Sequence, residues 1–194
     1  MPTEQPAAPG ANPPLDELSS AEASLTELQR VLHTIAADDL GKQTPCREFD
    51  IAALTDHLMN SITTIGGMAG ANLPTRDSTD SVERQVILAA QPAIDAWRTR
   101  GLDGSVQLGD NEVSAKVMVG ILSIEFLIHA WDYAQATGQN VQPAEEVSEF
   151  VFGLARKIIT PQGRSNVGFD DPVDISEDSP VFERLIAFTG RAPA

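Results

Sequence analysis

Cysteine and basic residues are both scarce in this chain of 194 residues. The only cysteine is Cys46, which excludes an internal disulfide and a zinc site built from several thiolates. Lys and Arg number 13 against 28 Asp and Glu, so the formal net charge is -15. Because no cluster of basic residues offers phosphates a partner, we expect no binding to nucleic acid and no docking on anionic lipid.

Long uninterrupted apolar runs are also missing. The most apolar stretch, residues 121–138, is broken by Glu125, His129 and Asp132, so we do not expect it to span a membrane. No basic segment followed by an apolar one, as in a secretory leader, is found near Met1. We therefore expect a soluble, cytoplasmic protein with one domain of ordinary size.

What the chain does contain is apolar residues at helical spacing. They predict helices over residues 18–35, 51–65, 82–100, 114–138 and 143–158. Asp50 is expected to cap the second helix, and Asp80 with Glu83 resembles a capping box that opens the third. After these helices, residues 167–175 could form one strand, and residues 180–188 one short helix.

These elements predict an all-α protein built as a bundle of four principal helices with a candidate fifth. The bundle would occupy residues 15–160, after a flexible N-terminal tail over residues 1–14 that is rich in Pro and Ala. Residues 161–194 would form a small C-terminal extension packed on the bundle. Bundles of this kind place metal and cofactor sites between facing helices.

The helix over residues 114–138 is apolar nearly all the way round, yet Glu125 and His129 lie one turn apart on one face. A carboxylate among apolar side chains is costly to desolvate unless something pairs with it. A metal ion would satisfy both groups, and so would a neutral, hydrogen-bonded Glu–His pair inside a helical core. Helical Glu/His spacing recurs without metal, so this stretch alone leaves both interpretations open.

Two stretches resemble the signature motifs of one superfamily. Residues 44–58, TPCREFDIAALTDHL, resemble T-P-C-x-x-W-x-x-x-x-L-x-x-H-L of the mycothiol-dependent maleylpyruvate isomerase-like, DinB-like superfamily. Residues 123–138, SIEFLIHAWDYAQATG, resemble its second signature, a Glu shortly before a His that leads into H-x-W-D-x-A-x-A-T-G. The end of the chain is similar to one uncharacterised, actinobacterial-type branch of this superfamily.

This resemblance implies a DinB-like four-helix bundle that holds a divalent metal, commonly zinc, through His57, Glu125 and His129. One departure is Phe49, where the motif has Trp. Two imidazoles and one carboxylate leave a coordination position open, as in catalytic zinc sites, although ferrous iron uses the same ligand set. Asp132 is expected either to orient an imidazole or bound water, or to bond the backbone near the helix end.

The function implied is that of a transferase or isomerase that uses mycothiol, or a similar small thiol, on a small electrophile. The alternative is a metal-binding bundle without turnover, serving as a sensor or interaction module. DNA repair, which the name DinB suggests, is opposed by the acidic composition. No catalytic acid, base or nucleophile can be identified beyond the ligands. Cys46 is expected to be a small buried residue rather than a ligand, and pairing into a homodimer is left open.

Overall fold

The computed structural model of the chain describes residues 14–164 and 169–193, and in these residues it is mainly helical. The described helices are α1 (Glu17–Leu32), the short 3-10 helix η1 (Ala37–Asp39), α2 (Ile51–Met68), α3 (Val82–Arg100), α4 (Ala115–Thr137), α5 (Glu145–Ile158) and α6 (Val181–Phe188). Strands β1 (Ser105–Leu108) and β2 (Asn111–Ser114) form an antiparallel hairpin just before α4. The predicted all-α class is thus confirmed in outline, with this hairpin as the exception.

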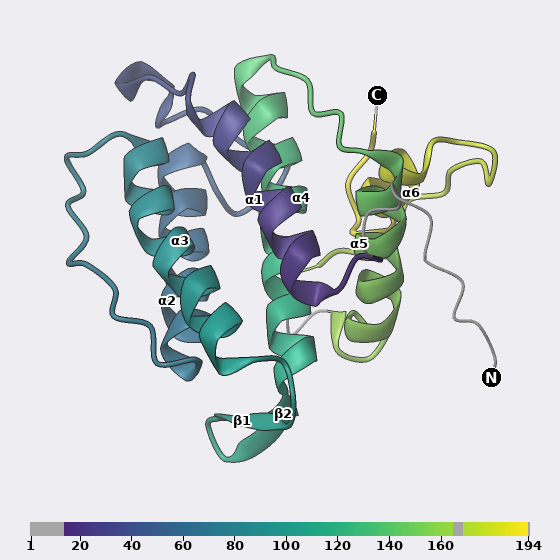
Figure 1. Cartoon of the computed structure of the whole chain (residues 1–194). Coiled ribbons are helices and arrows are strands. Elements are labelled where there is room, and N and C mark those ends of the chain that lie inside the picture. The colour runs from purple at the N-terminus through teal and green to yellow at the C-terminus, as the bar shows by residue number, and fades with distance from the viewer. Residues whose placement is uncertain (1–13, 165–168, 194) are drawn as a thin grey trace, which may run out of the picture.

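Helices α1 to α4 pack as a bundle, and α5 with α6 covers a further side of α4 (Figure 1). Within the bundle, α1 packs against α3 and α4, and α2 also packs against α3 and α4. Outside it, α5 packs against α4, α1 and α6. Helix α4 therefore lies between two groups of helices, which explains why its sequence is apolar nearly all the way round.

The buried side chains of α4 divide between two hydrophobic cores. Leu122, Phe126 and Tyr133 belong to the core of the α1–α4 bundle, whereas Leu127 and Ile128 belong to the core formed with α5 and α6. In the described part of the chain, α4 is the one helix long and apolar enough to cross a membrane, but 83% of its most apolar window is buried inside the protein. It is placed as a core helix of a soluble protein would be.

Most predicted helix ends agree with the structure. The Asp50 side chain accepts a hydrogen bond from the Ala53 N–H at 2.8 Å and caps α2, as predicted. Helix α4 ends at Gly138, whose φ of 71° is left-handed. The predicted cap of α3 was wrong: Ser81 accepts from the Arg84 N–H, while the Asp80 carboxylate is drawn to the Arg84 guanidinium.

Two other predicted elements need correction. Helix α1 ends at Leu32 rather than at residue 35, although Ile35 stays buried in the turn that follows. The strand predicted over 167–175 is not formed over 169–175, and residues 167 and 168 lie outside the described residues. Residues 1–13 of the predicted tail also lie outside them. Pro172 has no N–H to donate, and Val173 donates its N–H to the carbonyl of Ala187, in the last turn of α6, instead of to a neighbouring strand. The short helix predicted nearby is confirmed as α6.

Candidate metal centre

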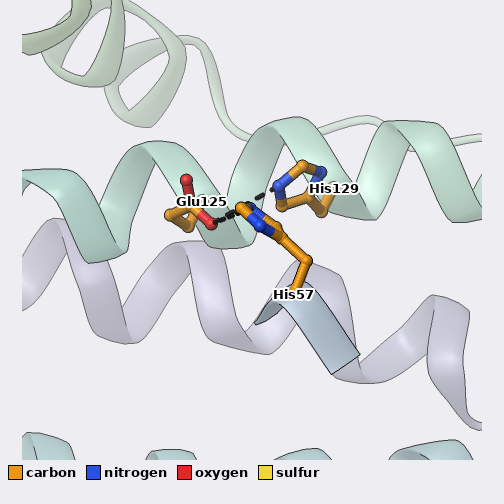
Figure 2. Close-up of side chains that lie close together, drawn as sticks. All are labelled: His57, Glu125 and His129. Carbon is orange, nitrogen blue, oxygen red and sulfur yellow. Dashed lines mark hydrogen bonds and ion pairs between the residues drawn. The ribbon is translucent and has the colours of Figure 1, made fainter. Parts of the chain in front are cut away.

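The three side chains predicted as ligands meet between α2 and α4 (Figure 2). His57 extends from α2, whereas Glu125 and His129 lie one turn apart on α4. The Glu125 Oε2 atom is 3.1 Å from His57 Nε2 and 3.4 Å from His129 Nε2. One donor atom from each residue lies within 4.8 Å of the others, so the group could hold a metal ion.

These separations suit a small divalent ion. Zinc bonds to nitrogen and oxygen are about 2.0–2.1 Å long, so tetrahedral geometry puts neighbouring donors about 3.3 Å apart. The observed 3.1 and 3.4 Å lie on either side of that value. Both imidazoles already present Nε2 toward the carboxylate, so a metal could be accommodated with little movement of the helices.

The other nitrogen of His129 is occupied. His129 Nδ1 lies 2.9 Å from Asp132 Oδ2, and a carboxylate can only accept, so Nδ1 carries the proton. That leaves Nε2 as the metal-binding atom of the neutral ring. Asp132 is fully buried, and Arg191 contacts both of its carboxylate oxygens at 2.7 Å. Of the two roles considered for Asp132, the geometry is that of a group orienting an imidazole.

The ionisable side chains of this cluster shift one another's pKa values. Burial alone would lower the pKa of His129, but its hydrogen bonds to Asp132 and Glu125 outweigh burial and raise that pKa to about 9. Burial would raise the pKa of Glu125, yet hydrogen bonds from His129 and His57 hold it well below its usual range. The pKa of Asp132 is also lowered, because hydrogen bonds from His129 and Arg191 outweigh the effect of burial. In the metal-free protein, a proton on His129 therefore compensates the carboxylates.

The loop before α2 packs against His57 through Phe49. The Thr44 hydroxyl is buried and donates to the carbonyls of Cys46 and Phe49, at 3.1 and 2.7 Å, which fixes the loop as a compact turn. The Phe49 ring stacks on the His57 imidazole, with the centroids 5.2 Å apart and an interplanar angle of 26°. Phe49, the one departure from the motif, therefore still packs against a predicted ligand.

The sequence patterns did not identify two residues of the site, Ser61 and Arg191. Ser61 follows His57 by one turn of α2 and donates its hydroxyl to Glu125 Oε2 at 3.1 Å. Its spacing from His57 was a usable signal. Arg191, by contrast, comes from the far end of the chain, and its sequence neighbourhood gives no indication that it reaches Asp132.

His57, Glu125 and His129 line a cavity of about 710 Å³. The rest of its lining comes from the loop before α2 and from C-terminal residues, which include Phe169, Asp170 and Arg191. Arg47 of the loop lies 3.4 Å from Asp170 of the C-terminal segment, so oppositely charged groups meet where the two walls approach each other. The predicted C-terminal extension is thus one wall of the cavity as well as a cover for the bundle.

Cys46 also lines this cavity but is not part of the possible metal-holding group. Cys46 was predicted to be a buried residue, but in the structure it is only half-buried. Burial raises the pKa of its thiol to about 11, although Arg191 acts in the opposite sense. Near neutral pH the thiol is protonated and a poor nucleophile.

The chain is similar to uncharacterized proteins from two strains of Mycobacterium tuberculosis. Each is 28% identical to it over 179 residues, which cover 91% of this chain and 98% of the relative. No protein-family model matches the chain, and no solved structure matches it. The function must therefore be argued from the geometry of the site.

Proposed function

We propose that the protein is a DinB-like bundle that binds one divalent metal ion, zinc, through His57, Glu125 and His129. The observation that carries this proposal is the convergence of two Nε2 atoms on one carboxylate oxygen, at 3.1 and 3.4 Å, in the lining of a cavity. Three protein ligands on a tetrahedral ion leave one position open, and this is the arrangement of catalytic rather than structural zinc.

We further propose that the site serves a transferase or isomerase that uses mycothiol or a similar small thiol on a small electrophile. A bound divalent ion supplies positive charge that favours the thiolate form of a thiol. The cavity of about 710 Å³ falls within the range of roughly 300–1,000 Å³ typical of small-molecule sites. Its walls provide apolar Phe49 and Phe169 beside charged Arg47 and Asp170, which suits a ligand with both polar and apolar parts.

The chain's own residues would bind and orient these reactants. His57 and His129 each offer an imidazole nitrogen, Glu125 offers the single negative ligand, and Asp132 keeps the His129 ring in one orientation. Cys46 is not one of the residues whose donor atoms lie within 4.8 Å of one another, and it therefore leaves the open position to an external thiol.

Metal analysis of the purified protein is the first test. We expect about one zinc per chain in the wild type and in His33→Ala, and much less in His57→Ala. His33 is a matched control because it is an exposed histidine that pairs with Glu83 away from the site. Equal metal content in all three proteins would contradict the assignment of His57.

Turnover is tested separately, by screening small electrophiles with and without mycothiol. Consumption of an electrophile that needs both zinc and the thiol would support the enzyme. Stoichiometric zinc binding with no thiol-dependent turnover would instead favour the alternative, a metal-binding bundle that acts as a sensor or interaction module.

A further inference from the structure

The C-terminal segment reaches the candidate metal centre through a turn that ends α6. The Arg191 N–H donates to the Ile186 carbonyl at 3.3 Å, and the Gly190 N–H donates to the Ala187 carbonyl at 3.0 Å. This pair of bonds is a Schellman motif, and it needs the left-handed φ of 84° at Gly190. A Cβ at Gly190 would also lie 2.5 Å from Asp170 Cβ, so only glycine fits. The turn sends the chain back toward the bundle and aims Arg191 inward.

The Arg191 guanidinium forms a bidentate ion pair with the Asp132 carboxylate. Its Nε donates to Oδ1 and its Nη2 donates to Oδ2, both at 2.7 Å. Asp132 Oδ2 is also the atom that accepts from His129 Nδ1 at 2.9 Å. A bidentate pair fixes the plane of the carboxylate, and the fixed carboxylate in turn fixes the plane of the imidazole.

Holding the C-terminal segment in place does not by itself account for this buried pair. Arg164 already anchors the segment, donating to the carbonyls of Asp170 and Phe188 at 2.9 and 2.7 Å. Leu185 and Ile186 of α6 are buried in the second core and attach the helix there. Buried ion pairs are often no more stabilising than apolar residues of the same volume, so stability alone does not account for a pair at this position.

We propose that Arg191 is a positioning residue of the metal centre. Acting through Asp132, it holds the His129 ring with Nε2 directed at the Glu125 carboxylate, and so it makes the C-terminal segment a working part of the site. This inference rests on the proposed metal binding. It adds a residue more than 60 positions from the nearest proposed ligand, His129.

Shape as well as charge is required of this residue. The planar guanidinium spans both oxygens of Asp132, whereas the ammonium of a lysine is a single point charge that cannot fix the carboxylate plane. Arg191→Lys should therefore recover only part of the function that Arg191→Gln loses.

Zinc affinity, measured by competition with a chromophoric chelator, is the primary readout. We expect Arg191→Gln to bind zinc about 10–100-fold more weakly than the wild type, with Arg191→Lys between them. Arg164→Gln is the matched control: it removes a buried arginine of the same segment that does not contact Asp132. It should lower the melting temperature but leave zinc affinity within about threefold of the wild type.

Two further measurements separate positioning from general structural damage. The visible spectrum of bound cobalt reports ligand geometry, and it should change in Arg191→Gln and stay unchanged in Arg164→Gln. In addition, Arg191→Gln should cost little further zinc affinity when Asp132→Asn is already present, because residues that act in series are not additive. Helical content by circular dichroism confirms folding, and Arg191→Lys keeps the test valid if Arg191→Gln fails to fold.

The outcomes separate this inference from the proposed metal site. A wild type that binds no metal would overturn both. Zinc binding by the wild type with equal affinity in Arg191→Gln would overturn only the role of Arg191. Full additivity with Asp132→Asn would likewise overturn it, because Arg191 would then not act through Asp132.

Discussion

At the scale of single residues, each nitrogen of His129 has a distinct partner. Nδ1 is held by Asp132 at 2.9 Å, and Nε2 faces Glu125 at 3.4 Å. The ring thus connects a buried ion pair on one side to the cavity on the other. Its protonation and its ability to bind metal are therefore in direct competition.

Metal affinity should depend on pH through this competition. The pKa of His129 is raised from 6.5 to about 9, so below pH 9 a metal must displace a proton from the ring. We expect zinc affinity to rise about tenfold per pH unit from pH 7 to 8 and to level off near pH 9. Calorimetric titrations in buffers of different ionisation enthalpy should show the proton released. Zinc binding that does not depend on pH and releases no proton would show that His129 is neutral before the metal binds.

The thiol of Cys46 should prove dispensable if the protein is an enzyme. Because its pKa is raised to about 11, the thiolate is a very small fraction at neutral pH. We expect Cys46→Ser to keep most thiol-dependent activity, whereas Glu125→Gln, which removes the negative ligand, should lose most of it. Activity of each variant is compared at matched metal content. Loss of turnover in Cys46→Ser with its metal retained would make the cysteine catalytic and the proposed chemistry wrong.

At the scale of elements, close approach of α2 and α3 depends on one glycine. A Cβ at Gly66 would lie 2.7 Å from Ala93 Cβ and 3.3 Å from Ala93 Cα, whereas a Cβ at the neighbouring Gly67 would meet nothing within 4 Å. Both glycines lie in the last turn of α2, so they share the same helical context and differ in what they face.

This difference predicts opposite effects of the same substitution. Gly66→Ala should destabilise the protein by about 1–3 kcal/mol, because the helices must move apart. Gly67→Ala should stabilise it by about 0.5–1 kcal/mol, because alanine loses less backbone entropy in a helix. Urea unfolding of both variants measures the free energies. Equal effects would mean that α2 and α3 are farther apart than described.

The helices were predictable from sequence because their signals are local. Apolar periodicity and capping residues such as Asp50 and Gly138 lie within the segments they define. The cap of α3 was misassigned because Asp80 and Ser81 are both good caps, and only the path of the chain decides between them. The hairpin of β1 and β2 carries a weaker local signal, since each strand has only four residues.

The candidate site was predictable only where helical spacing or a motif placed its residues. Glu125 and His129 share a helix face, and His57 was located by its motif. Arg191 was missed because its partner Asp132 is 59 positions away, and no local pattern encodes a contact made through a turn at Gly190. The role of the C-terminal segment as a wall of the cavity was missed for the same reason.

At the scale of the whole molecule, α4 connects everything described above. It contributes to both hydrophobic cores and carries Glu125, His129 and Asp132. The bound metal would join α4 to α2, and Arg191 joins it to the C-terminal segment. Metal binding at this site should therefore increase the free energy of unfolding of the entire protein.

Chelation should accordingly lower the melting temperature of the wild type. A ligand bound only by the native state stabilises it by about 2.7 kcal/mol when present at 100 times its dissociation constant. We expect the melting temperature to fall with a chelator and to recover with added zinc, while His57→Ala responds to neither. Differential scanning calorimetry gives the comparison. A wild-type melt unchanged by chelator would mean that the native state gains nothing from the ion.

The position of α4 between two cores also sets the order in which a growing chain can settle during synthesis. When α1 to α4 have left the ribosome, one side of α4 can pack, but the apolar side that carries Leu127 and Ile128 still lacks its partners α5 and α6. That side stays open to water, to chaperones or to another nascent chain until α6 emerges. Arg191 follows three residues after α6, so Asp132 gains the Arg191 guanidinium only after α6 has been made.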